Sequence, residues 1–238
     1  VPGRFSTRQA MLIGTAGSPQ SHAMAVVAQE EQVPFISLAH AEVPGPEGSW
    51  TIITPQPADL MAEAVIARMK ADGVKTVGYI GFSDNWGDQV YDALKAISPK
   101  YDIEVTSNER YSRTDDSVTG QILKVLAKKP DGVMTGTSGT PAALPFLALK
   151  DRGYKGKIYG MHSLINPAFM KLAGNSIEGL ICPAGPESVA EQLPEDNPMR
   201  QMTEVFRKAF EETTGQTTKN PFAAYSFDSW LLFLDAAE

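Results

Sequence analysis

The chain has 238 residues, of which 42% are hydrophobic and 21% are charged, and this balance excludes a disordered protein. Acidic residues outnumber basic ones by 28 to 21, so the net charge of −7 argues against general nucleic-acid binding. No apolar run approaches the ~18 residues of a membrane-spanning helix. The single cysteine, Cys182, excludes an internal disulfide and any multi-cysteine metal site.

Short β-branched segments alternate with amphipathic segments along most of the chain. Strands are expected at residues 11–13, 33–37, 50–54, 76–82, 103–105, 132–135, 157–160 and 177–182. Helices are expected after residue 18, at 58–71, up to about residue 97, and at 118–127, 142–150, 167–173, 198–213 and 223–237, and a loop rich in glycine and proline at 42–48. This alternation predicts an α/β protein whose parallel sheets are covered by helices on both faces.

Five turns rich in Gly, Ser and Thr follow predicted strands, at residues 14–18, 37–41, 83–87, 136–140 and 162–166. In α/β proteins, ligand loops collect at the carboxyl ends of the strands. The backbone N–H groups of such turns can face a polar or anionic ligand, although glycine and serine also serve simply to close tight turns. The recurrence of the pattern favours a binding site.

The sequence lacks the phosphate-loop, dinucleotide-binding and nucleophile-elbow motifs of common enzymes. The three histidines, His22, His40 and His162, do not have the spacing of metal ligands. Cys182 is expected to be a small buried residue rather than a nucleophile. We therefore expect a protein that is not an enzyme and that uses neither a cofactor nor a metal.

One pair of carboxylates, Asp115 and Asp116, precedes the helix expected at 118–127. We expect this pair to cap the helix and to place negative charge in its first turn, where the helix dipole favours it. Arg110 and Arg113 are expected to be surface partners of these two carboxylates.

Five segments stand in a distinctive order: LIGTAGSPQSHAMAVVAQEEQVPFISLAHA at 12–41, VKTVGYIGFSDNWG at 74–87, KKPDGVMTGTSGTPAALPFLALKDRGYKGKIYG at 128–160, NPAFMKLAGNSIEGLICPAGP at 166–186 and YSFDSWLLFLDAAE at 225–238. Their order and spacing resemble the branched-chain amino-acid type of periplasmic solute-binding proteins. The resemblance covers nearly the whole chain, although residues 1–9 do not match convincingly. The family's first βαβ unit and its C-terminal segment have no counterpart here, so we expect the chain to be part of a longer protein.

This resemblance implies a type I periplasmic binding fold, with two Rossmann-like α/β lobes of parallel sheets joined by hinge crossings. Lobe one would contain residues 1–54 and 184–238, and lobe two would contain residues 55–183. Members of the family trap a small solute between the lobes by hinge closure.

The resemblance also implies ligand contacts on both lobes. The candidate contacts are Thr15, Gly17, Ser18, Ala39, His40, Ala41, Trp86, Ser138, Gly139, Thr140, His162, Ser163 and Tyr225. The helix N-terminus at Ser18 would suit a carboxylate, and Trp86 would pack on the solute unless it is an ordinary surface aromatic. His40 is as readily a loop residue with its side chain in water. His162 stands where amino-acid-binding members carry an acid, which leaves open both an amino acid and an organic or aromatic acid without an amine.

The function implied by the resemblance is that of an extracytoplasmic solute-binding component of an ABC importer. It would capture a small carboxylate-bearing solute and deliver it to a membrane permease, with no role for nucleic acid. Its location would be periplasmic or otherwise extracytoplasmic, with the signal peptide outside this chain. The alternative is a cytoplasmic ligand-sensing regulator built on the same fold.

Overall fold

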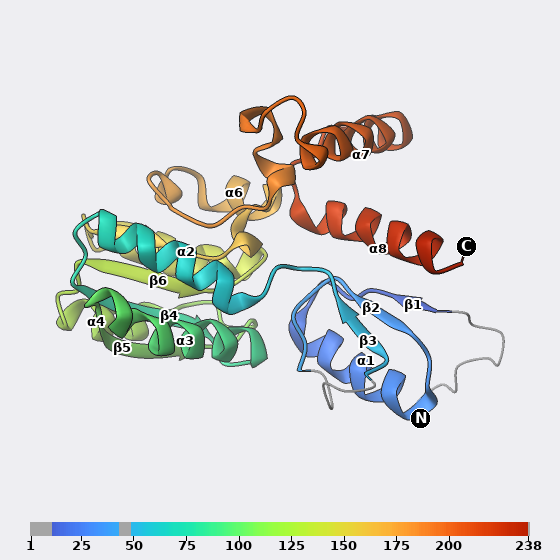
Figure 1. The fold of residues 1–238 in the computed structure, drawn as a ribbon. Coiled ribbons are helices and arrows are strands. Elements are labelled where there is room, and N and C mark those ends of the chain that lie inside the picture. Colours follow the sequence, from blue (N-terminus) through green and yellow to red (C-terminus); the bar gives the residue numbers. More distant parts are fainter. Residues whose placement is uncertain (1–10, 43–48, 238) are drawn as a thin grey trace. The chain divides into compact units, whose positions relative to one another are not determined.

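The computed structural model describes residues 11–42 and 49–237, and these residues form two units (Figure 1). Unit 1 comprises the described residues within Val1–Pro55, Pro194–Thr218 and Phe222–Glu238, and unit 2 comprises Gln56–Leu193 and Lys219–Pro221. The first boundary follows Pro55, next to the boundary expected between lobes, whereas residues 184–193 group with unit 2 rather than with unit 1. The division into two lobes that move as bodies stays a prediction. Residues 1–9 and most of the loop expected at 42–48 lie outside the described residues.

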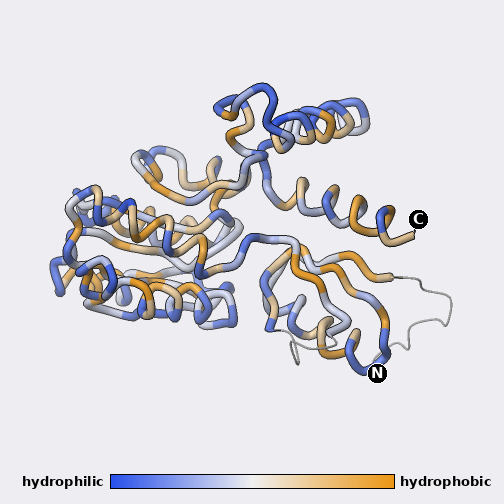
Figure 2. Tube along the Cα trace, viewed as in Figure 1, coloured by the Kyte–Doolittle hydropathy of each residue, from blue (hydrophilic) through white to orange (hydrophobic). Residues whose placement is uncertain are grey.

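Unit 1 contains a parallel sheet of β1 (Leu12–Ile13), β2 (Phe35–Ser37) and β3 (Thr51–Ile53), in the order β1-β2-β3. Figure 2 shows hydrophobic residues along these strands. Helix α1 (Ser18–Glu31) packs on the sheet through Ala25 and Ala28, whose small side chains let it approach Phe35 closely. Two further helices, α7 (Pro198–Thr214) and α8 (Pro221–Ala237), pack together through aromatic rings, those of Phe206 and Phe227 lying 5.4 Å apart.

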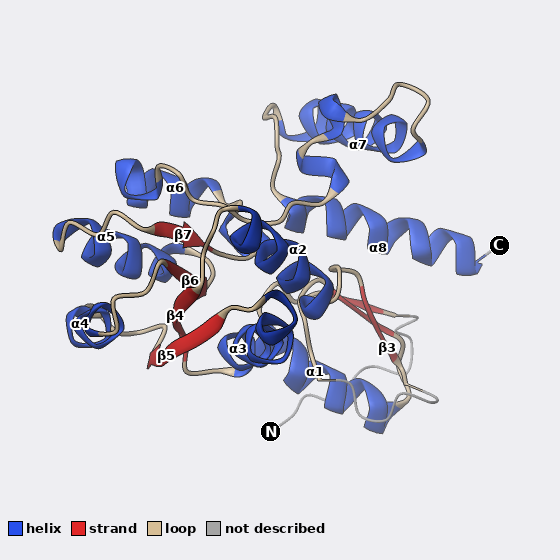
Figure 3. Ribbon diagram, turned by 60° about the vertical axis from the view of Figure 1, so that its left-hand side comes forward, coloured by secondary structure: helices blue, strands red, loops and turns tan. Residues whose placement is uncertain are grey.

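Unit 2 is built on a parallel sheet of β4 (Thr76–Phe82), β5 (Glu104–Tyr111), β6 (Gly132–Gly136) and β7 (Lys157–Tyr159), in the order β5-β4-β6-β7. Helices α2 (Ala58–Ala71) and α3 (Asn85–Ile97) cover one face, and α4 (Thr119–Ala127) and α5 (Ala143–Asp151) cover the other (Figure 3). Helix α6 (Pro167–Ala173) packs on α5. Since both faces are covered, the central strands β4 and β6 are almost entirely buried, as is usual for parallel sheets.

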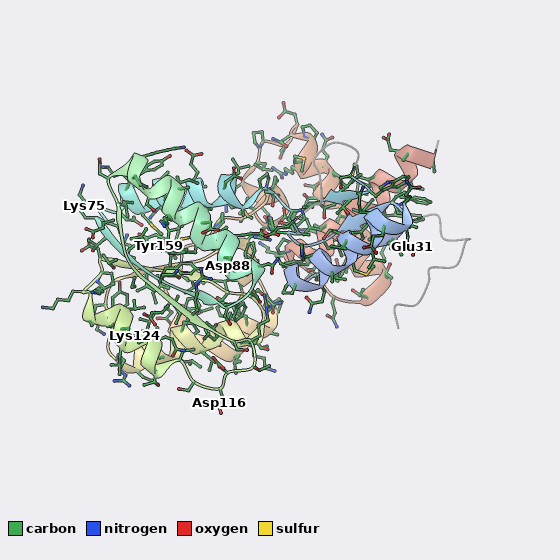
Figure 4. The ribbon with its side chains drawn as sticks, turned by 90° about the horizontal axis from the view of Figure 1, so that it is seen from below. Glu31, Lys75, Asp88, Asp116, Lys124 and Tyr159 are labelled. Carbon is green, nitrogen blue, oxygen red and sulfur yellow. The ribbon has the colours of Figure 1, made fainter. Side chains whose placement is uncertain are left out.

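The strand order of unit 2 reverses beside β4, which is a topological switch point. The chain passes from β4 to its neighbour β5 and then returns to β6 on the other side of β4. The loop after β4 therefore leads to α3 on one face, whereas the loop after β6 leads to α5 on the opposite face. Ligands of open α/β sheets bind at such points. In Figure 4, Lys75 precedes β4 at the amino edge, and Asp88 in the first turn of α3 marks the carboxyl edge.

Two expected strands differ from the observed ones. The strand expected at 103–105 extends to Tyr111, because β5 is an edge strand whose polar side chains give no hydrophobic signal. The prediction of a strand at 177–182 is wrong. A 3₁₀ turn occupies Gly174–Ile177, and in the segment that follows only Ile181 makes a β-bridge, to Tyr159. Gly179, with a φ of 81°, breaks the extended backbone before a strand can form. None of the helices within 11–42 and 49–237 is long and apolar enough to cross a membrane.

Candidate functional site

The loops that follow β4, β6 and β7 meet at the backbone carbonyl of Thr137. The indole Nε1 of Trp86 donates a hydrogen bond to this oxygen at 3.3 Å, and Ser163 Oγ donates to it at 2.8 Å. The ring of His162 lies edge-on to the indole, with centroids 5.9 Å apart. Unit 2 therefore brings together three residues that the sequence singled out, Trp86, His162 and Ser163, around one that it missed, Thr137. The signal for Thr137 is its place directly after the last residue of β6.

The four residues of this group are buried, with exposed fractions of 3% for Trp86, 0% for Thr137, 2% for His162 and 3% for Ser163. Trp86 is therefore not an ordinary surface aromatic. The role expected for its ring, packing on a solute, stays a prediction. A buried indole with its N–H satisfied fixes the distance between the β4 and β6 loops, because moving it would cost both packing and a hydrogen bond.

Helix α3 begins at a capped N-terminus that is tied to the neighbouring loops. Asp84 Oδ1 accepts hydrogen bonds from the backbone N–H groups of Trp86 at 3.0 Å and Gly87 at 3.2 Å. The other oxygen, Oδ2, accepts from Arg113 Nε at 2.6 Å. Arg113 Nη1 in turn donates to Ser138 Oγ at 2.9 Å, and its guanidinium lies 4.1 Å from the centre of the Phe82 ring. Loops from β5, β4 and β6 are thus joined through one arginine.

This network corrects the expectation about the carboxylate pair. Asp115 accepts from the backbone N–H of Ser112 at 2.9 Å and closes a turn, whereas α4 begins only at Thr119. Asp115 and Asp116 therefore do not cap α4. Arg113 pairs with Asp84, and Arg110 pairs with Asp88 at 2.9 Å. Both partners belong to the start of α3, because the sheet order sets the end of β5 beside the end of β4.

Tyr79 fixes the first turn of α3 from inside the sheet. Its hydroxyl donates to the backbone carbonyl of Gly87 at 2.6 Å. Its phenol fills the space in which a Cβ would stand at Gly81 and Gly136, two residues that face each other in the register of β4 and β6. Burial raises the pKa of Tyr79, so the hydroxyl stays protonated and remains a donor. The start of α3 is thus tied to the interior of the sheet as well as to the neighbouring loops.

The remaining lobe-two candidates line the same loop. Gly139 has a φ of 64°, a left-handed conformation that suits glycine, and it precedes the short 3₁₀ helix Thr140–Ala142. Ser138 and Gly139 are partly exposed and Thr140 is exposed. These residues therefore present polar groups at the surface of the β6 loop.

In unit 1, the turn before α1 has the features of an anion site. Thr15 Oγ1 donates to the carbonyl of Gly17 at 3.2 Å and lies 2.8 Å from Ser21 Oγ, so its hydroxyl is held within the turn. Gly17 is the N-cap of α1, and within the described chain no side chain caps this terminus. Ser18 is buried at the first helical position. Pro19 carries no N–H, so the first turn offers a carboxylate the backbone N–H groups of Ser18 and Gln20.

The second loop of unit 1 is shaped by Ser37, whose Oγ donates to the carbonyl of Ala39 at 2.7 Å. Ala39 and His40 are buried and Ala41 is partly buried, so the side chain of His40 does not lie in water. Tyr225 is buried in α8, with its ring edge-on to that of Phe222 at 5.7 Å. Ligand contact by each of these residues stays a prediction.

The other reactive groups of the described residues are one thiol and the side chains that could ligate a metal ion. Cys182 is partly buried outside any strand, and burial raises the pKa of its thiol, which keeps it a weak nucleophile. In the part of the chain that the structure describes, no group of three His, Cys, Asp or Glu residues could hold a metal ion.

Comparison with known proteins identifies the family. A family model described as periplasmic binding protein matches residues 8–238, whereas none of the curated proteins compared with the chain matches it. An extracellular ligand-binding receptor from Rhodopseudomonas palustris HaA2 is 38% identical, with a TM-score of 0.88 over 94% of this chain and 63% of the receptor.

Two more distant structures share the fold. A leucine-binding protein from Thermotoga maritima is 20% identical, with a TM-score of 0.81 over 95% of this chain and 63% of that protein. An ABC-transporter solute-binding protein from R. palustris, in complex with benzoate, is 19% identical, with a TM-score of 0.74 over 92% and 59% of the two chains. The present chain thus spans less than two thirds of the length of these structures. The expected fold of parallel α/β units is confirmed, and the chain belongs to the periplasmic binding protein family.

Proposed function

We propose that the chain is the solute-binding component of an ABC importer that works outside the cytoplasm. It captures a small carboxylate-bearing solute by closure of two lobes and delivers the solute to a membrane permease. The observation that carries this proposal is the junction of the β4, β6 and β7 loops on the Thr137 carbonyl. It supports binding because buried polar contacts hold a ready-made surface at the point where α/β sheets take ligands.

The carboxylate is supported by the N-terminus of α1, which no described side chain caps and whose N–H groups at Ser18 and Gln20, together with the helix dipole, favour an anion. The similar structures named above include a leucine-binding protein and a benzoate complex, and both of those small molecules carry a carboxylate. Residues 160–167 contain His162 and no acidic residue, so an ammonium group on the solute is not required by the sequence. The proposed solute is therefore an amino acid or an amine-free organic acid.

The proposal is tested by titration calorimetry of the protein with L-leucine, benzoate and a panel of amino, 2-oxo and aromatic acids. We expect at least one of them to bind with a Kd below about 1 mM and to be recovered chemically unchanged. His162→Gln should weaken that binding about tenfold or more. The matched variant His22→Gln, on α1, should bind like the parent.

Transport is tested in the source organism by deleting the coding sequence and following uptake of the radiolabelled solute. Loss of uptake, restored by the parent gene and less well by the His162 variant, is expected. Failure of every carboxylate to bind, or recovery of an altered product, would contradict the proposal.

A further inference from the structure

The arginine partner of Ser138 restricts the hydrogen bonds that the Ser138 hydroxyl can make. Arg113 Nη1 lies 2.9 Å from Ser138 Oγ. A guanidinium has only donors, so Ser138 Oγ is the acceptor of this bond. The one hydrogen of the hydroxyl is left to donate to another group. Ser138 is partly exposed on the β6 loop, next to the Thr137 junction, so that group can come from a bound solute.

Arg113 cannot readily release Ser138, because its guanidinium is held on two further sides. Nε donates to Asp84 at 2.6 Å, which is a short, charge-assisted hydrogen bond. The ring of Phe82 covers the guanidinium at 4.1 Å, and two thirds of the arginine side chain is buried. Asp84 is itself fixed by the backbone N–H groups that it caps. One lone pair of the Ser138 hydroxyl is therefore occupied before a solute arrives, and its hydrogen points away from the guanidinium.

We propose that Arg113 is a positioning residue that presents Ser138 as a hydrogen-bond donor, so that the site selects a solute with an oxygen acceptor at this position. This inference rests on the proposed function and narrows its solute class to acids that carry a carbonyl or a second carboxylate there. An ammonium group would have to use the remaining lone pair of Oγ, within reach of a positive guanidinium. A 2-oxo acid is thus favoured over the amino acid with the same carbon skeleton.

The test uses two matched pairs of solutes, 4-methyl-2-oxopentanoate with L-leucine and phenylpyruvate with L-phenylalanine. Calorimetry gives a Kd for each, and the ratio within a pair reports the choice between carbonyl and ammonium. We expect the parent to bind the 2-oxo member at least about tenfold more tightly. Ser138→Ala should remove most of that preference while changing the binding of the amino acid little.

Arg113→Met should lower the preference for the 2-oxo acid over the amino acid, because no guanidinium then donates to Ser138 Oγ. Arg113→Lys keeps a donor and should restore part of this preference. Arg110→Met is the control, since Arg110 pairs with Asp88 at the same edge but makes no bond to Ser138. Its ratio should equal that of the parent. A purely structural role of Arg113 would weaken both members of a pair equally, and this result would overturn the inference.

The outcomes separate the two proposals. A parent protein that prefers the amino acids overturns the inference and leaves the proposed function intact. The same holds if none of the four solutes binds while another carboxylate does. If no carboxylate binds at all, the proposed function fails, and the inference fails with it.

Discussion

A methyl group added at Gly136 is expected to destabilise unit 2 by displacing Tyr79. A Cβ at Gly136 would overlap the phenol oxygen of Tyr79 on the adjacent strand. Tyr79 is fully buried, and its hydroxyl is bonded to the Gly87 carbonyl, so the ring cannot move without losing that bond. Overpacking costs about 1–3 kcal/mol, and the lost hydrogen bond adds about 1 kcal/mol. Gly136→Ala should therefore lower the free energy of unfolding by about 2–4 kcal/mol, and the Tm by roughly 5–15 °C.

Urea denaturation and calorimetry of four variants check the reasoning: Gly136→Ala, Tyr79→Phe, the double variant and Gly120→Ala. Tyr79→Phe removes the overlapping oxygen, so Gly136→Ala should cost clearly less in that background than in the parent. Gly120→Ala is the control, because a Cβ at Gly120 in α4 meets nothing within 4 Å. This substitution should be neutral or should stabilise the protein by up to about 1 kcal/mol. The reasoning would be refuted if the costs of Gly136→Ala and Tyr79→Phe added within about 0.5 kcal/mol. It would equally be refuted if Gly136→Ala were as well tolerated as Gly120→Ala.

Two further predictions concern carboxylates at the amino edge of the unit 2 sheet. Asp72 accepts from Lys157 Nζ at 2.8 Å and from Tyr159 Oη at 2.8 Å, and these bonds lower its pKa from 3.8 to about 2. The stabilisation is present above about pH 4 and is lost as the pH falls towards 2, so the stability gap between the parent and Asp72→Asn should close over that range. A gap in urea denaturation that stays constant down to pH 2 would contradict this. Asp131 Oδ2 accepts hydrogen bonds from the backbone N–H and the hydroxyl of Thr76 at 2.9 Å each. Asp131→Ala should therefore lower the free energy of unfolding by about 1–3 kcal/mol. Its cost should not add to that of Thr76→Val, because both changes remove the same bond, and additive costs would contradict this.

Buried elements with local start and stop signals could be predicted from the sequence. The strand expected at 76–82 is β4, because a continuous apolar run ends at a polar turn. The helix expected at 167–173 is α6, where Pro167 stands in the first turn and Asn166 caps it with its side-chain oxygen. Edge strands were harder to predict. One side of β5 faces away from the core, and the polar residues of this strand show no alternation of hydrophobicity that would distinguish them from a loop.

In the candidate site, too, the features with a local sequence signal could be predicted and those that depend on distant residues could not. Turns at the ends of strands could be located because glycine and serine follow each apolar run. The pairing of Arg113 with Asp84 could not be predicted, because 29 positions separate these residues and only the order β5-β4-β6 brings them together. Sequence proximity instead suggested Asp115 and Asp116 as partners, which is wrong. Thr137 was missed for a similar reason, since its backbone carbonyl, rather than its side chain, is the group that joins the loops.

The position of β4 between β5 and β6 has a consequence for how the proposed site would discriminate solutes. Helix α3 is held at its start from both sides, by Arg113 of the β5 loop and by Thr137 of the β6 loop. A site whose loops are already fixed loses little conformational entropy when a solute binds. Such a site also cannot turn its polar groups to suit a different solute. Selectivity in unit 2 would then depend on which groups are presented, the directed hydroxyl of Ser138 above all, so Arg113 should govern the choice of solute more strongly than it governs the stability of the fold.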